Sequence, residues 1–469
     1  MLLKVISSPG LAHTSYFFAD KGEAFIIDPR RDIDIYLEHA FKHCDKIKYV
    51  FETHRNEDYL SGSIELGNRT EAEIGHSKEL NFTYGDHKLN HDDTFIIGDY
   101  TVKCLWTPGH TVESMCYALY ESNLCNDALA VFTGDTLFVG DVGRTDLSGK
   151  EKWRQLSGQL YESLHKILLP LGDHVLIYPS HSAGSICGSR ISNRTFSSIG
   201  IEKRTNPQLA LSRDDFIKER LGNVMPRPPY FDMMENMNLK GPESNESFLE
   251  PFMLTPIEFN EKTRTVNIFI MDTRQPDAYA SSHVPNSVNI WLNGVTYYPG
   301  WLIGYNQKIL LVSGSNEDAV QAATYLHRIG YDKIIGFLCP GIEAWRNKGF
   351  PTEAMSSIHV KELFERLEKE NLFVLDVRED HEYDSGHIAG SKHIYVGDLP
   401  GRIDEIPYNE LICVTCGWGG RAGIAASYLK NNGYRTLNLL GGMNAWSSVG
   451  LPVVAETKVD GKKVAVCPF

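Results

Sequence analysis

The second half of the chain repeats itself, and this repeat constrains the fold more than any other feature of the sequence. MDTRQPDAYASSHVPNSVNI at 271–290 matches LDVREDHEYDSGHIAGSKHI at 375–394, and PGIEAWRNKGFP at 340–351 matches GGMNAWSSVGLP at 441–452. A unit of roughly 100 residues is too long for the stacked repeats of a solenoid. Each copy alternates short apolar segments with helix-like segments. We therefore expect two tandem α/β domains, each with a parallel sheet and helices on both faces.

The first half of the chain carries no such repeat. It ends in a polar stretch, NLKGPESNESFLEPF, whose composition is typical of a linker. With 469 residues the chain is too long for a single hydrophobic core. We predict three domains of α/β class, at residues 1–245, 255–354 and 355–455.

Composition excludes several classes of function. A formal net charge of -14 argues against nucleic-acid binding. No apolar run is long enough to predict a membrane span, and the first residues make a poor signal peptide. The 9 cysteines are scattered and odd in number, so they do not suggest a disulfide framework. We expect a cytoplasmic protein in a reducing compartment.

A group of metal-ligand residue types follows an apolar run that is typical of a buried strand. In THRNEDYLSG at 53–62, His54 and Asp58 have the spacing of the metal-binding box His-x-His-x-Asp-His. Asn56 and Tyr59 occupy the places of the other two histidines. A neutral amide and a neutral phenol are poor ligands for zinc, so the box is incomplete.

Three further polar residues each follow an apolar strand: His110 in LWTPGHTVESM, Asp135 in ALAVFTGDTLFVGDVGR and His181 in VLIYPSHSAGSICGS. A single loop histidine is usually a solvated residue. However, α/β folds collect ligands at the carboxyl ends of their strands. Several strand ends that each deliver a His or an Asp therefore favour a shared site with His54.

These motifs resemble the metallo-β-lactamase superfamily, and the resemblance implies an αββα sandwich. In two-metal members, one ion is held by the first two box histidines and a next-loop histidine. The other ion is held by the box aspartate, the last box histidine and a late histidine, and an aspartate bridges both ions. The corresponding residues here are His54, Asn56 and His110, then Asp58, Tyr59 and His181, with Asp135 as the bridge. A two-zinc hydrolase is therefore disfavoured.

The residues that remain at the first site are His54, His110 and Asp135. Two histidines and one carboxylate form the facial triad of non-haem Fe(II) oxygenases. The persulfide dioxygenase branch of the superfamily resembles this case, which implies one Fe(II) per chain, with a thiol persulfide and O2 as substrates. The residues expected around the iron, or at an alternative zinc site, are Asp58, His181, Asn56 and Tyr59.

Two arginines near these loops are candidates to contact an anionic substrate, such as the carboxylates of glutathione. They are Arg144 in DVGRTDL and Arg190 in CGSR. The alternative is that such an arginine pairs with a nearby carboxylate, for example Asp141 or Asp146.

The last repeat carries a second chemical motif, ICVTCGWGGRAG at 412–423. A glycine-rich loop that leads into a helix can direct N–H groups at one sulfur and favour its thiolate. The motif resembles the rhodanese sulfurtransferases, which implies that Cys416 accepts sulfane sulfur and that Arg421 helps bind the donor. Asp376 and Arg378 match family positions with a structural role. The loop residues between the cysteine and the arginine are further candidates to bind the substrate: Gly417, Trp418, Gly419 and Gly420.

The middle repeat lacks these groups. Aligning AATYL with AASYL places Ser313 at the position of Cys416 and Asp318 at that of Arg421. A serine hydroxyl stays protonated at neutral pH, and a carboxylate repels an anionic donor. Cys339 lies elsewhere in the repeat. We therefore expect an inactive rhodanese-like domain.

Together these features predict an enzyme of sulfur metabolism. It would oxidise a thiol persulfide such as glutathione persulfide to sulfite, and its rhodanese domain would form thiosulfate or a persulfide. A homodimer or higher homo-oligomer is expected. Two alternatives stay open: a zinc-dependent thioester hydrolase of the glyoxalase II type, and a metal-free scaffold for the Cys416 domain.

Overall fold

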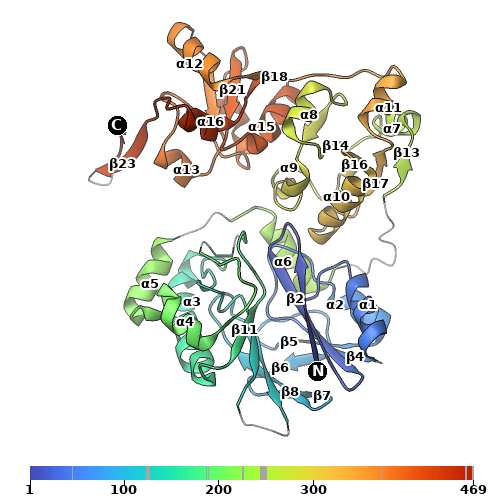
Figure 1. Ribbon diagram of the computed structural model, residues 1–469, viewed down its shortest axis with the longest axis vertical. Coiled ribbons are helices and arrows are strands. Elements are labelled where there is room, and N and C mark those ends of the chain that lie inside the picture. The colour runs from blue at the N-terminus through green and yellow to red at the C-terminus, as the bar shows by residue number, and fades with distance from the viewer. Residues whose placement is uncertain are drawn as a thin grey trace. The chain divides into compact units, whose positions relative to one another are not determined.

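The computed structural model describes residues 1–44, 46–122, 127–185, 187–188, 190–223, 227–242, 251–370, 372–459 and 462–466. The chain forms two compact units (Figure 1). The first comprises Met1–Phe248, with the short segment His327–Gly330 grouped with it, and the second comprises the rest. Among the described residues, no helix is both long and apolar enough to cross a membrane.

The first unit contains two six-stranded sheets. The strands of the first sheet, in spatial order, are β1 (Leu2–Ser8), β2 (His13–Asp20), β3 (Glu23–Ile27), β4 (Lys46–Phe51), β5 (Glu73–Ser77) and β6 (His87–Leu89). The strands of the second sheet, in spatial order, are β12 (Ser197–Ser198), β11 (Leu176–Pro179), β10 (Ala130–Gly134), β9 (Met115–Glu121), β8 (Tyr100–Trp106) and β7 (Thr94–Ile97).

Helices cover the outer faces of both sheets. Successive side chains of a strand point to opposite faces. Phe18 therefore joins a buried cluster with Phe132 of the second sheet, while its neighbour Phe17 joins a cluster with Tyr36 of a helix. The covering helices are α1 (Asp34–His43), α2 (Ser63–Thr70), α3 (Lys150–Glu162), α4 (Ile199–Thr205) and α5 (Arg213–Gly222), with the short elements η1 (Ser163–Leu168), η2 (Leu169–Leu171) and η3 (Pro207–Ala210). A further helix, α6 (Phe231–Lys240), contacts the loop that carries the box motif. The predicted αββα sandwich is confirmed.

One buried carboxylate ties the two sheets together. Asp28 directly follows β3 and is fully buried. It accepts hydrogen bonds from the backbone N–H of Thr53 and from Thr53 Oγ1, both at 2.7 Å, and another from Ser180 Oγ. Thr53 lies just after β4 in the first sheet, and Ser180 lies just after β11 in the second. Burial raises the pKa of Asp28, and these donors partly oppose that shift.

Replacement of Asp28 by Asn should loosen both strand ends. The amide NH2 of the asparagine would face at least one of the groups that now donate to Asp28, so that group would lose its acceptor. An unsatisfied buried donor of this kind costs about 3 kcal/mol. We expect a lower midpoint in chemical unfolding and faster hydrogen exchange in β4 and β11. The matched control is Asp99→Asn, which removes only an exposed partner of Lys21 and should have little effect. Equal unfolding midpoints of the two variants would contradict the role of Asp28 in connecting the two sheets.

The second unit contains two five-stranded sheets in which all neighbouring strands are parallel. The first, in spatial order, is β13 (Met253–Leu254), β17 (Ile334–Leu338), β16 (Lys308–Val312), β14 (Ile268–Asp272) and β15 (Ser287–Asn289). The second is β18 (Ser356–Ile358), β22 (Arg435–Leu439), β21 (Leu411–Thr415), β19 (Phe373–Asp376) and β20 (Lys392–His393). A hairpin of β23 (Ala455–Val459) and β24 (Lys462–Val466) follows.

Short helices connect the parallel strands, as the alternating sequence pattern predicts. The helices of the first repeat are α7 (Pro256–Lys262), α8 (Pro276–Ser281), α9 (Pro299–Leu302), α10 (Asn316–Arg328) and α11 (Ile342–Asn347), with the turn η4 (Leu292–Gly294). Those of the second are α12 (Val360–Lys369), α13 (Asp380–Ser385), α14 (Leu399–Arg402), α15 (Gly420–Asn431) and α16 (Gly442–Ser448), with the turn η5 (Ile403–Glu405).

The two repeats share individual hydrogen bonds as well as topology. Arg274 binds the buried carboxylate of Asp272 and a carbonyl oxygen eight residues further on. Arg378 binds the buried carboxylate of Asp376 and the equivalent carbonyl oxygen. These buried pairs hold a strand end to the following helix, which supports a structural role for Asp376 and Arg378. Matching indole N–H bonds to a proline carbonyl are made by Trp345 and Trp446.

Candidate metal centre and cysteine loop

Four strand ends of the first unit deliver buried polar side chains to one place. His54 follows β4, His110 follows β8, Asp135 follows β10 and His181 follows β11, and each is at most 3% exposed. His110 Nε2 lies 3.6 Å from Asp135 Oδ2, and His181 Nδ1 lies 2.7 Å from Asp135 Oδ1. The rings of His54 and His110 are 4.9 Å apart and nearly perpendicular, at 85°. The structure thus brings these four residues together.

Hydrogen bonds outside the cluster fix the orientation of both candidate histidine ligands. His54 Nδ1 lies 2.9 Å from Thr53 Oγ1, which itself donates to Asp28 and therefore accepts from the ring. His110 Nδ1 donates to the backbone oxygen of Arg144 at 2.9 Å. Each imidazole is thereby held with its Nε2 atom facing the cluster. Such support of the distal nitrogen is typical of metal-binding histidines.

The atoms that face the cluster fit a bound cation. His54 Nε2, His110 Nε2 and Asp135 Oδ2 are buried and have no hydrogen-bond partner. Leaving a buried polar atom unpaired costs about 1–3 kcal/mol, and a metal ion bound by these atoms would satisfy them. His110 Nε2 is the atom they share: it lies 3.6 Å from Asp135 Oδ2 and belongs with His54 to a ligand group whose atoms lie within 4.8 Å of one another. Their donor set of two imidazoles and one carboxylate suits a divalent transition metal.

His181 lies between two carboxylates. Its Nδ1 atom is 2.7 Å from Asp135 Oδ1, and its Nε2 atom is 3.1 Å from Asp58 Oδ2. Burial alone would lower the pKa of His181, but the charges of Asp135 and Asp58 raise it well above the usual value. The contact with His181 therefore helps to orient Asp135.

The two atypical box residues hold the shape of the loop. Asn56 donates to the backbone oxygen of His54 at 3.4 Å. The fully buried ring of Tyr59 lies over His13, with centroids 4.0 Å apart, and burial keeps the pKa of Tyr59 well above its usual value. Asn238 on α6 donates to the backbone oxygens of both residues, at 2.8 and 2.7 Å. The hydroxyl of Tyr59 is itself buried without a hydrogen-bond partner among the described residues.

Sequence reasoning missed two members of the cluster, Glu57 and Cys187. His54, Glu57 and His110 offer ligand atoms within 4.8 Å of one another, and so do Glu57, Asp135 and Cys187. Cys187 Sγ donates to Glu57 Oε1 at 3.4 Å, and burial raises the pKa of its thiol well above the usual value. The available signals were a carboxylate inside the box motif and a cysteine in the same loop as His181.

Binding of a metal at this centre should release protons. Burial alone would lower the pKa of His54, but Glu57, Asp135 and Asp28 together raise it to about 9. Without metal the ring is therefore protonated at neutral pH, whereas a ligand imidazole must be neutral. We expect metal affinity to increase as the pH is raised from neutral to about 9. Calorimetry in buffers of different ionisation enthalpy measures the release, and buffer-independent heats would contradict it.

The two arginines proposed as substrate contacts lie in different settings. The Arg144 guanidinium is buried and binds Asp146 through two hydrogen bonds of 2.6 and 2.8 Å. This is the carboxylate pairing considered as the alternative. Arg190 is exposed, and its backbone N–H donates to Asp141 Oδ2 at 2.9 Å.

The candidate nucleophile of the second unit lies at the end of a buried strand. Cys416 follows β21 and is 1% exposed. The backbone N–H of Gly419 donates to Cys416 Sγ at 3.1 Å, and the φ of Gly419 is +123°, a conformation that favours glycine. On the other side Met443, on α16, donates its N–H to the backbone oxygen of Cys416 at 2.7 Å. The loop therefore presents its sulfur to an N–H donor at the start of α15.

The arginine of this motif, Arg421, already forms an ion pair. Arg421 forms two hydrogen bonds with Glu382 of α13, one of them 2.7 Å long. Burial would lower the pKa of Arg421, but Glu382 holds it above its usual value. The pair ties the cysteine loop to α13, which favours a positioning role for Arg421 over that of an unpaired cation for the donor.

The middle repeat contributes to the surroundings of this loop. The rings of Trp291 and Trp418 meet edge to face, with centroids 5.3 Å apart. A side chain at Gly420 would collide with Trp418 and come within 3.0 Å of Trp291. The two repeats are joined nearby by a hydrogen bond of 3.0 Å from the N–H of Asn289 to Ser427 Oγ. The predicted spacer domain thus covers one side of the cysteine loop.

The equivalent loop of the middle repeat has no thiol. Ser313 follows β16, and its hydroxyl lies 2.8 Å from that of Thr273. Asn316 begins α10 where the active repeat has its glycines. Cys339 lies at the end of β17, after a different strand. This arrangement fits the predicted loss of sulfur chemistry.

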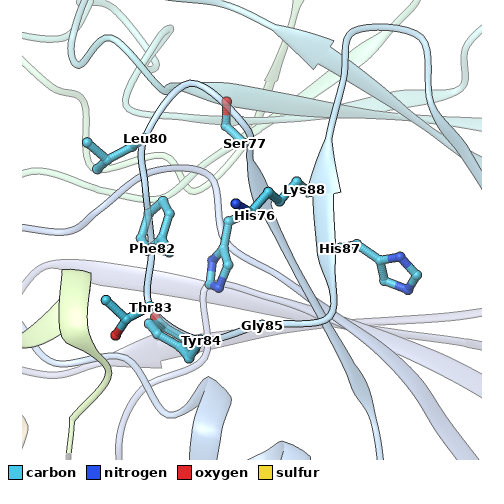
Figure 2. A pocket seen from close by; sticks show the side chains of 9 residues that line it. All are labelled: His76, Ser77, Leu80, Phe82, Thr83, Tyr84, Gly85, His87 and Lys88. Carbon is cyan, nitrogen blue, oxygen red and sulfur yellow. The ribbon is translucent and has the colours of Figure 1, made fainter.

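A separate pocket of about 230 Å³ lies beside β5 and β6 (Figure 2). His76 lines it and stacks on Phe82, with ring centroids 4.2 Å apart. His76 Nδ1 is 3.2 Å from the buried carboxylate of Glu52, which also accepts hydrogen bonds from Ser61 Oγ and Tyr84 OH. None of the residues that line this pocket is a candidate metal ligand.

Comparison with protein families identifies both kinds of domain. Residues 8–181 match the metallo-beta-lactamase superfamily, and residues 255–348 and 359–449 match the rhodanese-like domain. The chain thus combines a metallo-β-lactamase domain with two rhodanese-like domains, as its motifs predict.

Individual relatives add functional context. The chain is 26% identical over 247 residues to "Persulfide dioxygenase ETHE1, mitochondrial" of Mus musculus, which covers 51% of this chain and 88% of the relative. It is 26% identical over 214 residues to hydroxyacylglutathione hydrolase of Dictyostelium discoideum, which covers 39% of this chain and 77% of the relative. A solved metallo-beta-lactamase of Staphylococcus aureus superimposes with a TM-score of 0.64 and 29% identity, over 72% of this chain and 98% of that one. These similarities support an enzyme in sulfur metabolism that binds a metal.

Proposed function

We propose that the first unit is an iron-dependent persulfide dioxygenase and that the last rhodanese-like domain transfers sulfur. The convergence of His54 Nε2, His110 Nε2 and Asp135 Oδ2, all buried and unpaired, carries the proposal. Two histidines and one carboxylate leave open positions on an octahedral ion for substrate and O2. The similarity to a persulfide dioxygenase over half of the chain supports this choice of chemistry.

The overall oxidation balances as RSSH + O2 + H2O → RSH + SO3²⁻ + 2 H⁺. The sulfane sulfur is oxidised to sulfite, and O2 takes up the electrons. A bound Fe(II) would supply the one-electron chemistry that allows O2 to react. His54, His110 and Asp135 would hold that ion. His181 keeps Asp135 oriented through its 2.7 Å contact, and the buried setting of all four residues excludes bulk water.

The rhodanese-like domain would use the sulfite. Cys416 attacks the sulfane sulfur of a second persulfide, its S–S bond breaks, and RSH leaves while the persulfide of Cys416 forms. Sulfite then takes the outer sulfur, which gives thiosulfate and restores the Cys416 thiol. The N–H of Gly419 faces the sulfur that carries negative charge in both steps.

Two variants should separate the activities. Asp135→Ala should lower iron content and reduce O2 uptake with glutathione persulfide by at least about 100-fold, because a ligand is lost. Cys416→Ser should leave O2 uptake and sulfite formation intact and abolish thiosulfate formation, since a hydroxyl cannot carry sulfane sulfur. An oxygen electrode and quantification of sulfite and thiosulfate measure both results.

Metal analysis of protein purified without oxygen tests the proposal against the alternatives. We expect one iron per chain. Two tightly bound zinc ions, with hydrolysis of acyl-glutathione in the absence of O2, would instead indicate a hydrolase, as in the Dictyostelium discoideum relative. Absence of metal, with sulfur transfer unchanged by His54→Ala, would indicate a scaffold for the Cys416 domain.

A further inference from the structure

Glu57 is a buried carboxylate that neither the box motif nor the iron triad uses. It is 1% exposed and lies in the same loop as His54. One of its oxygens lies 3.4 Å from His110 Nε2, and the other lies 3.7 Å from His54 Nε2. Both nitrogens are buried and lack a hydrogen-bond partner. Glu57 therefore faces the same space as the two candidate histidine ligands.

Without a metal, the charge of Glu57 is offset by the imidazoles of His54 and His110, and only while these rings are protonated. A carboxylate removed from water needs a positive partner or several donors. The thiol of Cys187, a weak donor, lies 3.4 Å from one of its oxygens. The arginine of the same loop, Arg55, binds Glu235 at 2.8 Å instead.

The distances fit a shared ion. Ligand atoms bonded at about 2.1 Å to one metal stand roughly 3.0 to 3.4 Å apart. The separations of His110 Nε2 from Glu57 and from Asp135 are 3.4 and 3.6 Å, and that of His54 Nε2 from Glu57 is 3.7 Å. Each of these three contacts is thus close to the spacing of two ligands on one ion.

We propose that Glu57 is a fourth protein ligand of the metal, which supplies a carboxylate where Asn56 has removed an imidazole. The proposal rests on the metal site of the proposed function and deepens it. Two histidines and two carboxylates neutralise a divalent ion, and the added oxygen donor favours iron or manganese over softer metals. A metal ion held by these four residues would still have room for substrate and O2.

The test measures metal binding without turnover. Metal-free full-length protein is titrated anaerobically with Fe(II) in competition with a coloured chelator. Glu57→Gln keeps the shape of the side chain and removes its charge, so we expect Fe(II) affinity to fall at least about tenfold. We also expect a changed EPR spectrum of the Fe(II)–nitrosyl complex. Glu57→Asp withdraws the carboxylate by one methylene and should give an intermediate loss if Glu57→Gln does not fold.

The matched control is Glu52→Gln. Glu52 is also a buried carboxylate beside an imidazole, at 3.2 Å from His76 Nδ1, but it lies outside the candidate ligand groups. Its replacement should leave affinity and spectrum unchanged. Wild-type affinity in Glu57→Gln, or reduced affinity with an unchanged spectrum, would overturn the bonded role. Because no substrate is present, these affinities decide the role of Glu57 whether or not the wild type consumes O2.

Discussion

The first unit depends on the hydrogen bonds that converge on Asp28. This carboxylate joins the end of β4 to the end of β11 through Thr53 and Ser180, so it fixes the distance between two strands of different sheets. The residues that follow these donors in sequence are His54 and His181. The same hydroxyl of Thr53 that donates to Asp28 also holds the ring of His54. The contact that closes the sandwich therefore also sets the geometry of the candidate metal centre.

Charge balance explains why a cation fits this centre. Glu57, Asp58 and Asp135 are all buried there, and no more than a few ångströms separate them from imidazoles. Without metal, the histidines must take up protons to offset the carboxylates, which is why the pKa of His54 is raised to about 9 despite its burial. A divalent ion can replace protons on His54 and His110 while His181 stays charged beside Asp135. The proposed centre would thus consist of metal ligands and one protonated partner.

Much of this could be predicted from the sequence, because position along a strand is encoded in local patterns. The apolar runs before His54, His110 and Asp135 mark strands, and strand ends meet at one edge of the layers. The direction of a side chain within an irregular loop has no such signal. Glu57 could therefore not be recognised as a neighbour of His110, although it lies inside the motif. Asp28 was equally hidden, since its partners lie far away in sequence.

The two rhodanese-like repeats share residues that hold the fold but differ in the residues of the cysteine loop. The middle repeat retains the Asp272–Arg274 pair of the last repeat, so its fold is preserved by the same hydrogen bond. The middle repeat lacks the thiol and the glycine whose N–H faces that thiol. Sulfur transfer would require both groups, whereas the fold does not. Its Trp291 nevertheless lies against Trp418 in the loop of the active repeat. A repeat without the thiol therefore still contacts the glycine-rich cysteine loop of its neighbour.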